Sequence, residues 1–350
     1  MSNSASVLVD PLAALIEGPS RAALRLALAV PLSGPLGMTG PAALACAMLA
    51  AEEANESGGL RGRALELVTV DAGRAPDEVA ADMRGLLAAG AVDAVCGFHT
   101  SDVHRALKAV TANRTPYVFT PPHEGGRPGQ GVVLLGESPR EQLAPVTAQL
   151  SARRALRRWA LVGNDYIWPW AVHAAAVPML RASGAEVVLD RLVPFGGVDA
   201  ERLVSEVRRS GTQVVLLSLV GRDLATFNRA FARAGLTDRI LRVSGALEEN
   251  GLLEAGGDDS GELYAVMPWF ASEADVDGFA QRYADRWGPT APALGAYAHG
   301  CYQGVRHIAA LAAADALNVR SLGTTAPGPT GRRNRAKLAR ADGLTLTVVH

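Results

Sequence analysis

Polar and aromatic side chains follow three apolar, strand-like runs of this chain, at the points where each run ends. The three runs end in Gly97-Phe98-His99-Thr100-Ser101, in Thr120-Pro121-Pro122-His123-Glu124-Gly125 and in Val162-Gly163-Asn164-Asp165-Tyr166-Ile167-Trp168-Pro169. In open α/β sheets, ligands lie outside the carboxyl ends of the strands. These segments therefore indicate a binding site for a small molecule.

Ser101 stands where a helix is expected to begin, directly after the first of these runs. A helix N-terminus offers free N–H donors and partial positive charge, and a hydroxyl group there can donate to the same acceptor. Such a position can hold an amide oxygen or a carboxylate. A plain helix cap is the alternative, because serine is favoured at this position with or without a ligand.

Pro121 and Pro122 fix two backbone φ angles and remove two N–H groups, which favours a rigid wall with carbonyl acceptors. The imidazoles of His99 and His123 can donate or accept hydrogen bonds beside that wall. Because no third ligand follows at a recognisable spacing, the sequence predicts neither a metal site nor a cofactor.

A second group of candidates follows later in the chain. Tyr166 and Trp168 can bury apolar surface over a ligand while each offers one hydrogen bond. The loop at Val220-Gly221 ends another strand-like run. Glu248, or its neighbour Glu249, lies on a further loop, and a buried carboxylate there would imply a ligand with an amino group. A solvated carboxylate would instead fit a neutral amide or urea.

The composition is that of a globular protein with no strong electrostatic preference. The chain has 350 residues, 49% of them hydrophobic, and a formal net charge of −1. A nearly balanced charge disfavours direct binding of nucleic acid and suits a small neutral or zwitterionic ligand. The chain has no nucleophile elbow, no phosphate-binding loop and no His-Glu-x-x-His helix, so we expect no enzymatic activity.

Strand-like and helical patterns alternate along the chain, which predicts an α/β protein with two doubly wound parallel-sheet lobes. The predicted strands of the first lobe are Leu24–Val30, Leu65–Val70, Val92–Gly97, Tyr117–Thr120 and Val132–Glu137. Those of the second are Trp159–Val162, Glu186–Val193, Val214–Val220, Ile240–Val243 and Leu263–Met267. The predicted helices are Gly40–Ser57, Pro76–Ala89, Ser101–Asn113, Trp168–Ala182, Ala200–Arg209, Asp223–Ala234, Asp275–Trp287 and Ala291–Ala314, with a last strand at Leu344–Val349.

From about Leu24 to the C-terminus the chain resembles the type I periplasmic-binding-protein superfamily. The resemblance is carried by Leu32-Ser33-Gly34-Pro35-Leu36-Gly37, Glu53-Ala54-Asn55-Glu56-Ser57-Gly58-Gly59-Leu60-Arg61-Gly62, Asp165-Tyr166-Ile167-Trp168-Pro169 and Gly295-Ala296-Tyr297-Ala298-His299-Gly300. The Asp-Tyr-Ile-aromatic-Pro turn is similar to that of the amide-sensing amidase regulators and the urea and amide receptors. His99 and His123 depart from this branch, because they stand where it has aromatic residues.

The resemblance implies a hinge that the chain crosses three times, near Glu137–Gln142, Pro268–Ser272 and Val319–Thr325, with the ligand in the cleft between the lobes. We expect an N-terminal leader at 1–23, a first lobe at 24–139 plus 270–320 and a second at 140–269 plus 321–350. Ser101 matches the binding serine of the family, and Glu248 the region of its ammonium-pairing acid. The expected ligand-binding residues are His99, Thr100, Ser101, Phe119, Pro121, Pro122, His123, Tyr166, Trp168, Val220, Gly221 and Glu248.

The function that we expect is non-catalytic binding of an amide, a urea-like compound or an amino acid, coupled to closure of the cleft. The first 30 residues lack a clean basic, apolar and cleavable signal, which favours a cytoplasmic sensor in the regulation of amide metabolism. Such a sensor would have a regulatory protein partner and could form a homodimer. The alternative is an exported substrate-binding component of an ABC transporter for branched-chain amino acids, amides or urea, with a permease as partner.

Overall fold

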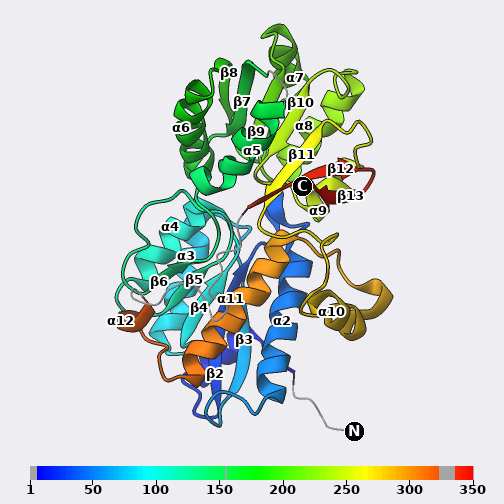
Figure 1. Cartoon of the computed structure of the whole chain (residues 1–350). Coiled ribbons are helices and arrows are strands. Elements are labelled where there is room, and N and C mark those ends of the chain that lie inside the picture. The colour runs from blue at the N-terminus through cyan, green and yellow to red at the C-terminus, as the bar shows by residue number, and fades with distance from the viewer. Residues whose placement is uncertain (1–5, 154–155, 323–335, 350) are drawn as a thin grey trace.

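Short, mostly apolar strands build a first lobe around a six-stranded parallel sheet (Figure 1). The computed structural model describes residues 6–153, 156–322 and 336–349. The sheet has the order β1-β3-β2-β4-β5-β6 and contains β1 (Leu8–Val9), β2 (Ala23–Val30), β3 (Ala64–Asp71), β4 (Ala94–Gly97), β5 (Tyr117–Phe119) and β6 (Val132–Leu134).

The central strand β2 is buried on both faces, because alternate side chains enter two separate cores. Leu26 and Leu28 pack into the core that contains α2 (Gly40–Glu56) and α11 (Ala296–Ala313), whereas Ala27 and Ala29 pack into the core of α3 (Pro76–Ala88) and α4 (Ser101–Thr111). Helices on both faces make this lobe doubly wound. The remaining helices of this part of the molecule are α1 (Pro11–Glu17), α10 (Phe279–Trp287), α12 (Val319–Leu322) and the short 3-10 turns η1 (Gly34–Leu36) and η2 (Gly288–Thr290).

The second lobe lies above the first in Figure 1 and has a seven-stranded sheet of order β13-β12-β11-β10-β9-β7-β8. Its parallel strands are β7 (Arg158–Asn164), β8 (Glu186–Val193), β9 (Val214–Ser218), β10 (Leu241–Ser244) and β11 (Leu263–Met267). Its helices are α5 (Pro139–Arg153), α6 (Ile167–Ala182), α7 (Ala200–Arg209), α8 (Gly221–Arg233) and α9 (Glu249–Ala255). The expected fold class, with two parallel-sheet lobes, is confirmed.

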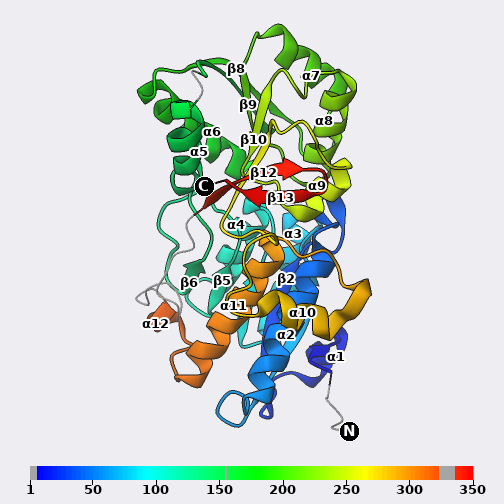
Figure 2. The ribbon, with the colours of Figure 1, turned by 45° about the vertical axis from the view of Figure 1, so that its right-hand side comes forward.

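An antiparallel hairpin at the sheet edge adds to the predicted parallel arrangement. β12 (Lys337–Asp342) pairs antiparallel with β11 and with β13 (Thr345–Val348), and Figure 2 shows the two hairpin strands side by side. Gly343 has φ of 58° in the connecting turn, a conformation that favours glycine. The second of these strands was predicted from the sequence, but the first was not.

Part of the segment 1–23, which we expected to be an N-terminal leader, belongs to the first lobe. Leu8 and Val9 pair with β3, and the side chain of Asp10 caps the following helix by accepting the N–H groups of Leu12 and Ala13. Ala14 of this helix is fully buried. Residues 8–17 are therefore folded against the sheet and are not a separate extension.

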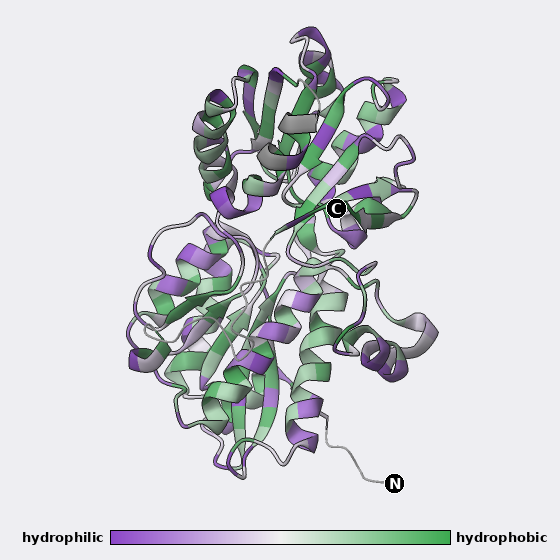
Figure 3. Cartoon of the chain, viewed as in Figure 1, coloured by the Kyte–Doolittle hydropathy of each residue, from purple (hydrophilic) through white to green (hydrophobic). Residues whose placement is uncertain are grey.

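The chain passes from the first sheet to the second between β6 and α5, and leaves the second sheet after β11. The third expected crossing, Val319–Thr325, begins in α12 and continues outside the described residues. The lobe boundaries 24–139 plus 270–320 and 140–269 plus 321–350 stay a prediction. Figure 3 shows the hydrophobic interior of each lobe, with hydrophilic residues on the outer helices. Within the described ranges, no helix is long and apolar enough to cross a lipid bilayer.

Candidate functional site

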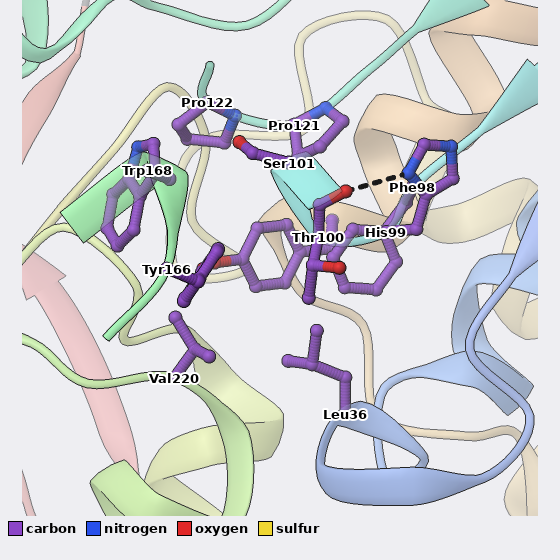
Figure 4. A pocket seen from close by; sticks show the side chains of 11 residues that line it. Leu36, Phe98, His99, Thr100, Ser101, Pro121, Pro122, Tyr166, Trp168 and Val220 are labelled. Atoms are coloured by element: carbon purple, nitrogen blue, oxygen red, sulfur yellow. Dashed lines mark hydrogen bonds between the residues drawn. The ribbon is translucent and has the colours of Figure 1, made fainter. Parts of the chain in front are cut away.

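A pocket lies between the two lobes, at the carboxyl ends of their strands (Figure 4). The first lobe contributes side chains from η1, from the β4–α4 and β5–β6 connections and from α11, and the second contributes the ends of β7 and β9. The lining residues are Leu36, Phe98, His99, Thr100, Ser101, Pro121, Pro122, Tyr166, Trp168, Val220 and Tyr297. Of the described residues, none with a charged side chain lines this pocket.

Ser101 opens α4 at one wall of the pocket. Thr100 is the N-cap residue and has extended backbone angles, but its side chain makes no capping hydrogen bond. The hydroxyl group of Ser101 donates to Oε2 of Glu124 at 3.0 Å. A ligand that accepts a hydrogen bond from the Ser101 hydroxyl must therefore displace the bond to Glu124.

The same helix end carries a second carboxylate, on Asp102. Burial raises the pKa of Asp102, whereas the charge of Arg105 and a hydrogen bond from the backbone N–H of Ile167 oppose that effect. The bond from Ile167, at the start of α6, joins the two lobes. Asp102 and Glu124 together place negative charge at the helix terminus, and this charge disfavours an anionic ligand there.

His99 is committed to a hydrogen-bond chain inside the first lobe. Its Nδ1 lies 3.2 Å from the Thr100 carbonyl oxygen, and its Nε2 lies 3.1 Å from the Tyr117 hydroxyl. The same hydroxyl lies 2.8 Å from Nδ1 of His104. Burial lowers the pKa of His99 to about 4, so its ring is neutral at physiological pH. His99 therefore contributes ring surface to the pocket and has no unpaired nitrogen for a ligand.

Pro121 and Pro122 line the pocket, but the Pro121 carbonyl oxygen does not face it as the sequence led us to expect. A Cβ atom at Gly136 would lie 2.1 Å from the Pro121 carbonyl oxygen, so that oxygen is packed against the next strand connection. Pro121 and Pro122 thus offer the pocket mainly apolar ring surface. Phe98 and Tyr297 extend this surface, because their rings stack with centroids 4.3 Å apart and an interplanar angle of 11°.

Trp168 supplies the unpaired donor of the pocket. It lies in the first turn of α6, is 4% exposed, and its Nε1 atom is buried without a hydrogen-bond partner. A buried donor without a partner carries the full cost of losing water, about 1–3 kcal/mol. An acceptor atom on a ligand would recover that cost. Tyr166, just before the helix, packs beside it against Phe195 with a centroid distance of 5.4 Å.

The lobes touch at the far side of the pocket, where η1 meets the start of α8. A Cβ atom at Gly221 would lie 2.2 Å from the Pro35 carbonyl oxygen, and Gly221 has φ of +52°. Glycine is therefore required by both the backbone angle and the close approach. Val220 lines the pocket, while Gly221 serves the contact between the lobes.

Glu248 is buried, but it does not line this pocket. It is the N-cap residue of α9, and its carboxylate accepts the backbone N–H of Asn250 at 3.1 Å and the Asn250 side-chain amide at 3.2 Å. Its Oε2 lies 1.5 Å from where a Cβ atom of Gly295 would be, which leaves room only for glycine there.

Glu249 is buried beside it, and the backbone N–H of Ala271 donates to its Oε1 at 2.7 Å. Burial raises the pKa of both carboxyl groups well above their usual range. The charge of Glu249 raises the pKa of Glu248 further.

The pocket includes eight of the twelve residues nominated from the sequence. Phe119, His123, Gly221 and Glu248 lie outside its lining. Phe119 is fully buried in the sheet and packs on His104 with ring centroids 4.1 Å apart. His123 accepts the backbone N–H of Gly125 through Nδ1 at 3.0 Å. As binding residues these four, like the other eight, stay a prediction.

Three lining residues were not nominated from the sequence, namely Leu36, Phe98 and Tyr297. All three stand in segments that the sequence singles out, at Leu32–Gly37, Gly97–Ser101 and Gly295–Gly300. Their place in these segments was the available signal. In the parts of the chain that the structure describes, no cluster of three or more His, Cys, Asp or Glu side chains has the arrangement of a metal site.

Comparison with known proteins places this architecture among binding proteins. A family model described as "Periplasmic binding protein" matches residues 23–338. A fatty acid ABC transporter substrate-binding protein from Thermomonospora curvata has 15% sequence identity and a TM-score of 0.80, covering 95% of this chain and 93% of that one.

Two further solved structures are similar. A solute-binding protein of an ABC transporter from R. palustris, in complex with 4-hydroxybenzoate, has 16% identity and a TM-score of 0.77, covering 94% and 95%. The branched-chain amino acid transporter substrate-binding protein LivJ from Streptococcus pneumoniae, in complex with isoleucine, has 17% identity and a TM-score of 0.77, covering 93% and 99%. At these identities the likeness establishes the fold.

The cytoplasmic location predicted from the sequence is wrong. The family model is that of periplasmic binding proteins, and the similar structures are solute-binding proteins of ABC transporters, which are exported. The prediction relied on the lack of a clean signal pattern in the first 30 residues. Residues 8–17 of that stretch form a strand and a helix of the fold. Their sequence pattern therefore reflects the fold and is a poor guide to location.

Proposed function

Because this chain belongs to the periplasmic binding protein family, and is therefore a ligand-binding protein, we propose that it is the substrate-binding component of an ABC transporter for a small neutral amide with an apolar body. The observation that carries the proposal is the buried Nε1 donor of Trp168, which has no partner in a pocket without charged side chains. The likeness to transporter solute-binding proteins supports the transport role over a regulatory one.

The polar groups of the pocket favour a ligand that accepts hydrogen bonds. Trp168 Nε1 and the Ser101 hydroxyl are donors, and both residues line the pocket (Figure 4). A carboxylate and a carboxamide each carry a suitable oxygen. The carboxylate would meet Asp102 and Glu124 at the same helix end, whereas the neutral amide avoids that repulsion.

The rest of the pocket favours an apolar ligand body. Leu36, Pro121, Pro122 and Val220 line it together with the stacked rings of Phe98 and Tyr297. An amino acid would in addition need a partner for its ammonium group. The candidate that the family resemblance offered for that role, Glu248, lies outside the lining and is bonded to Asn250. A primary amide with a small aromatic or branched aliphatic body fits best.

A comparison of matched ligands tests this assignment. Isothermal titration and thermal unfolding would be measured with benzamide against benzoate, and with isobutyramide against isobutyrate and isoleucine. A ligand that binds only the folded state raises its apparent stability. We expect the amides to bind at least tenfold more tightly than their acids. Tighter binding of benzoate, isobutyrate or isoleucine than of the amides would overturn the amide assignment.

The transport role implies a membrane permease that recognises the closed form, and no catalytic step in this chain. With the cognate permease reconstituted in vesicles, the amide-loaded protein should stimulate ATP hydrolysis more than the protein alone. Equal stimulation with and without amide would contradict the role. A homodimer stays a prediction.

A further inference from the structure

A second cavity lies at the hinge, on the other side of the proline wall. Glu137 and Gly136 line it from the first chain crossing, and Met267 and Pro268 line it from the second. Pro121, Pro122 and Tyr297 line both this hinge cavity and the pocket between the lobes. The hinge cavity is therefore a separate space that shares a wall with the candidate ligand site.

Glu137 is the unexplained group in the hinge cavity. Its side chain is buried, with the residue 7% exposed, and its Oε2 atom accepts no hydrogen bond. Burial raises the pKa of Glu137 to about 7, and the charge of Glu141 on α5 raises it as well, while its own backbone N–H lowers it. No Lys or Arg is among the residues that line the cavity, within the described part of the chain. Its carboxyl group therefore has an acceptor oxygen without a hydrogen-bond partner and, among the described lining residues, without a cation beside it.

The other polar side chains of the hinge cavity have roles within the protein. Thr120 donates its hydroxyl to the Gly97 carbonyl at 3.2 Å, and His299 Nε2 lies 3.3 Å from the Gln303 amide nitrogen. The His299 ring also stacks on Trp269 with centroids 4.9 Å apart. Burial lowers the pKa of His299 to about 4, so it adds no positive charge near neutral pH. Glu137 is left as the group that a ligand can satisfy.

The surroundings of Glu137 select an organic cation over a metal ion. Hard metal ions require several oxygen ligands, whereas the described residues supply one carboxylate among side chains such as Leu135, Met267 and Pro268. An ammonium group donates three hydrogen bonds and carries one charge, and an alkyl chain attached to it can contact the apolar wall. Ion pairing would satisfy Oε2 and hold the carboxylate in its charged form.

We propose that the hinge cavity is a second ligand site, which takes a small primary alkylammonium ion through a charge-assisted hydrogen bond to Glu137, with the alkyl chain against Leu135 and Met267. This site does not depend on the ligand proposed for the pocket between the lobes. Both crossing segments form it, so its width follows the angle between the lobes.

Isothermal titration of the full-length protein with n-propylammonium chloride at pH 8 tests the proposal. Sodium chloride and 1-propanol serve as controls for ionic strength and for the alkyl chain. We expect saturable 1:1 binding with a dissociation constant of about 1 mM or lower, in the range accessible to so small a ligand. Propanol should show at least tenfold weaker binding. No saturable binding of propylammonium by the wild-type protein would overturn the proposal.

Two variants locate the binding. Glu137→Gln keeps the shape of the side chain but removes its charge, and should weaken propylammonium binding at least tenfold. Glu141→Gln removes an equal charge from an exposed position in the first turn of α5 and should leave binding within about twofold. A cooperative thermal transition of each variant would establish that it is folded. Unchanged binding by folded Glu137→Gln would place the ammonium ion elsewhere and contradict the proposal, as would an equal loss in both variants.

Discussion

Ser101 and Trp168 line the pocket from opposite lobes. They differ in whether their hydrogen-bond donor already has a partner within the protein. The Ser101 hydroxyl already donates to Glu124, whereas Trp168 Nε1 is buried without a partner. A ligand oxygen therefore gains more from Trp168 than from Ser101. On the proposed function, we therefore expect Trp168 to contribute more to ligand affinity than the helix terminus at Ser101.

Ser101→Ala should weaken amide binding modestly and leave the fold intact. The loss should be about 0.5–1.5 kcal/mol, the net value of one neutral hydrogen bond, because the bond to Glu124 is lost in exchange. Titration calorimetry with benzamide measures the effect. Ser57→Ala, which removes an exposed hydroxyl bonded to the Glu53 carbonyl at the end of α2, is the matched control. Equal affinities of both variants would reduce Ser101 to a helix residue without a binding role.

Glu248→Gln should stabilise the protein at neutral pH and leave amide affinity unchanged. Below its ordinary pKa of 4.5 the carboxyl group is protonated in both the folded and the unfolded chain. Above pH 4.5 the Glu248 carboxyl group ionises in the unfolded chain, but burial keeps it protonated in the folded chain until the pH reaches its raised pKa of about 8. Wild-type stability therefore falls as the pH rises from 4.5 to that raised pKa. Urea unfolding should show a gain for the variant of roughly 1–3 kcal/mol at pH 8 and less at pH 5.

Glu254→Gln, in the same helix but partly exposed, is the control for this experiment and should change stability little at either pH. A Glu248→Gln variant that is less stable than the wild type at pH 8 would show that the carboxylate stabilises the fold. A large loss of ligand affinity would return Glu248 to the binding site.

Residue types at strand ends predicted most of the residues that line the pocket, but not the hydrogen-bond partners of each side chain. His99 has both ring nitrogens engaged by Thr100 and Tyr117, and the second of these partners lies on a neighbouring strand. Glu248 turns away to Asn250 and the start of α11. Such partners come from tertiary packing, which a single sequence does not reveal.

Close packing of α11 on the first sheet supports one wall of both cavities. A Cβ atom at Gly304 would lie 2.6 Å from the Cys96 sulfur and 2.7 Å from Cγ2 of Thr120, closer than side-chain contacts allow. The same atom at Gly300, one turn earlier, would lie 3.6 Å from Thr120 in ordinary contact. Glycine is thus required at one of these two positions and not at the other.

Gly304→Ala should destabilise the protein by about 1–3 kcal/mol through overpacking, despite the better helix propensity of alanine. Gly300→Ala is the matched control and should be neutral or stabilising by up to about 1 kcal/mol. Urea unfolding of both variants measures the difference. If Gly304→Ala were as stable as Gly300→Ala, α11 would not pack on the sheet as closely as described.

Several elements were predicted from the sequence with the bounds that the structure has, and others were missed. β8 (Glu186–Val193), β11 (Leu263–Met267) and α7 (Ala200–Arg209) have the predicted bounds. α5 was not predicted, because it has prolines at its start and at Pro145 and no clear apolar face. β12 depends on antiparallel pairing with β11, about 70 residues earlier, and such long-range pairing leaves little local signal.

At the scale of the whole molecule, contacts across the cleft hold the two lobes close together. Gly221 meets Pro35, Ile167 donates to Asp102, and the Tyr297 hydroxyl donates to the Ala246 carbonyl at 3.4 Å. A ligand that touches both lobes stabilises this arrangement by the contacts that an open form lacks. The two-lobed plan followed from the alternating pattern, whereas these contacts join loops far apart in the sequence and could not be predicted.

Gly221→Ala should hold the lobes apart. Its Cβ atom would lie 2.2 Å from the Pro35 carbonyl oxygen, so closure would be blocked and amide affinity should fall at least tenfold. Gly235→Ala is the matched control, since that glycine also has a positive φ, of +66°, but a Cβ atom there would meet no other atom within 4 Å. Small-angle scattering should show a smaller radius of gyration on benzamide addition for the control and no change for Gly221→Ala. Equal compaction of both variants would contradict closure at this contact.

The indole N–H of Trp168 provides the most direct test of ligand binding between the lobes. Among the five tryptophan side chains labelled with nitrogen-15, a Trp168→Phe variant identifies the Trp168 resonance. Saturating benzamide should shift the Trp168 Nε1–H proton downfield and slow its exchange with solvent, as a new hydrogen bond requires. A Trp168 resonance that keeps its position and exchange rate while calorimetry shows the amide fully bound would contradict binding through this donor.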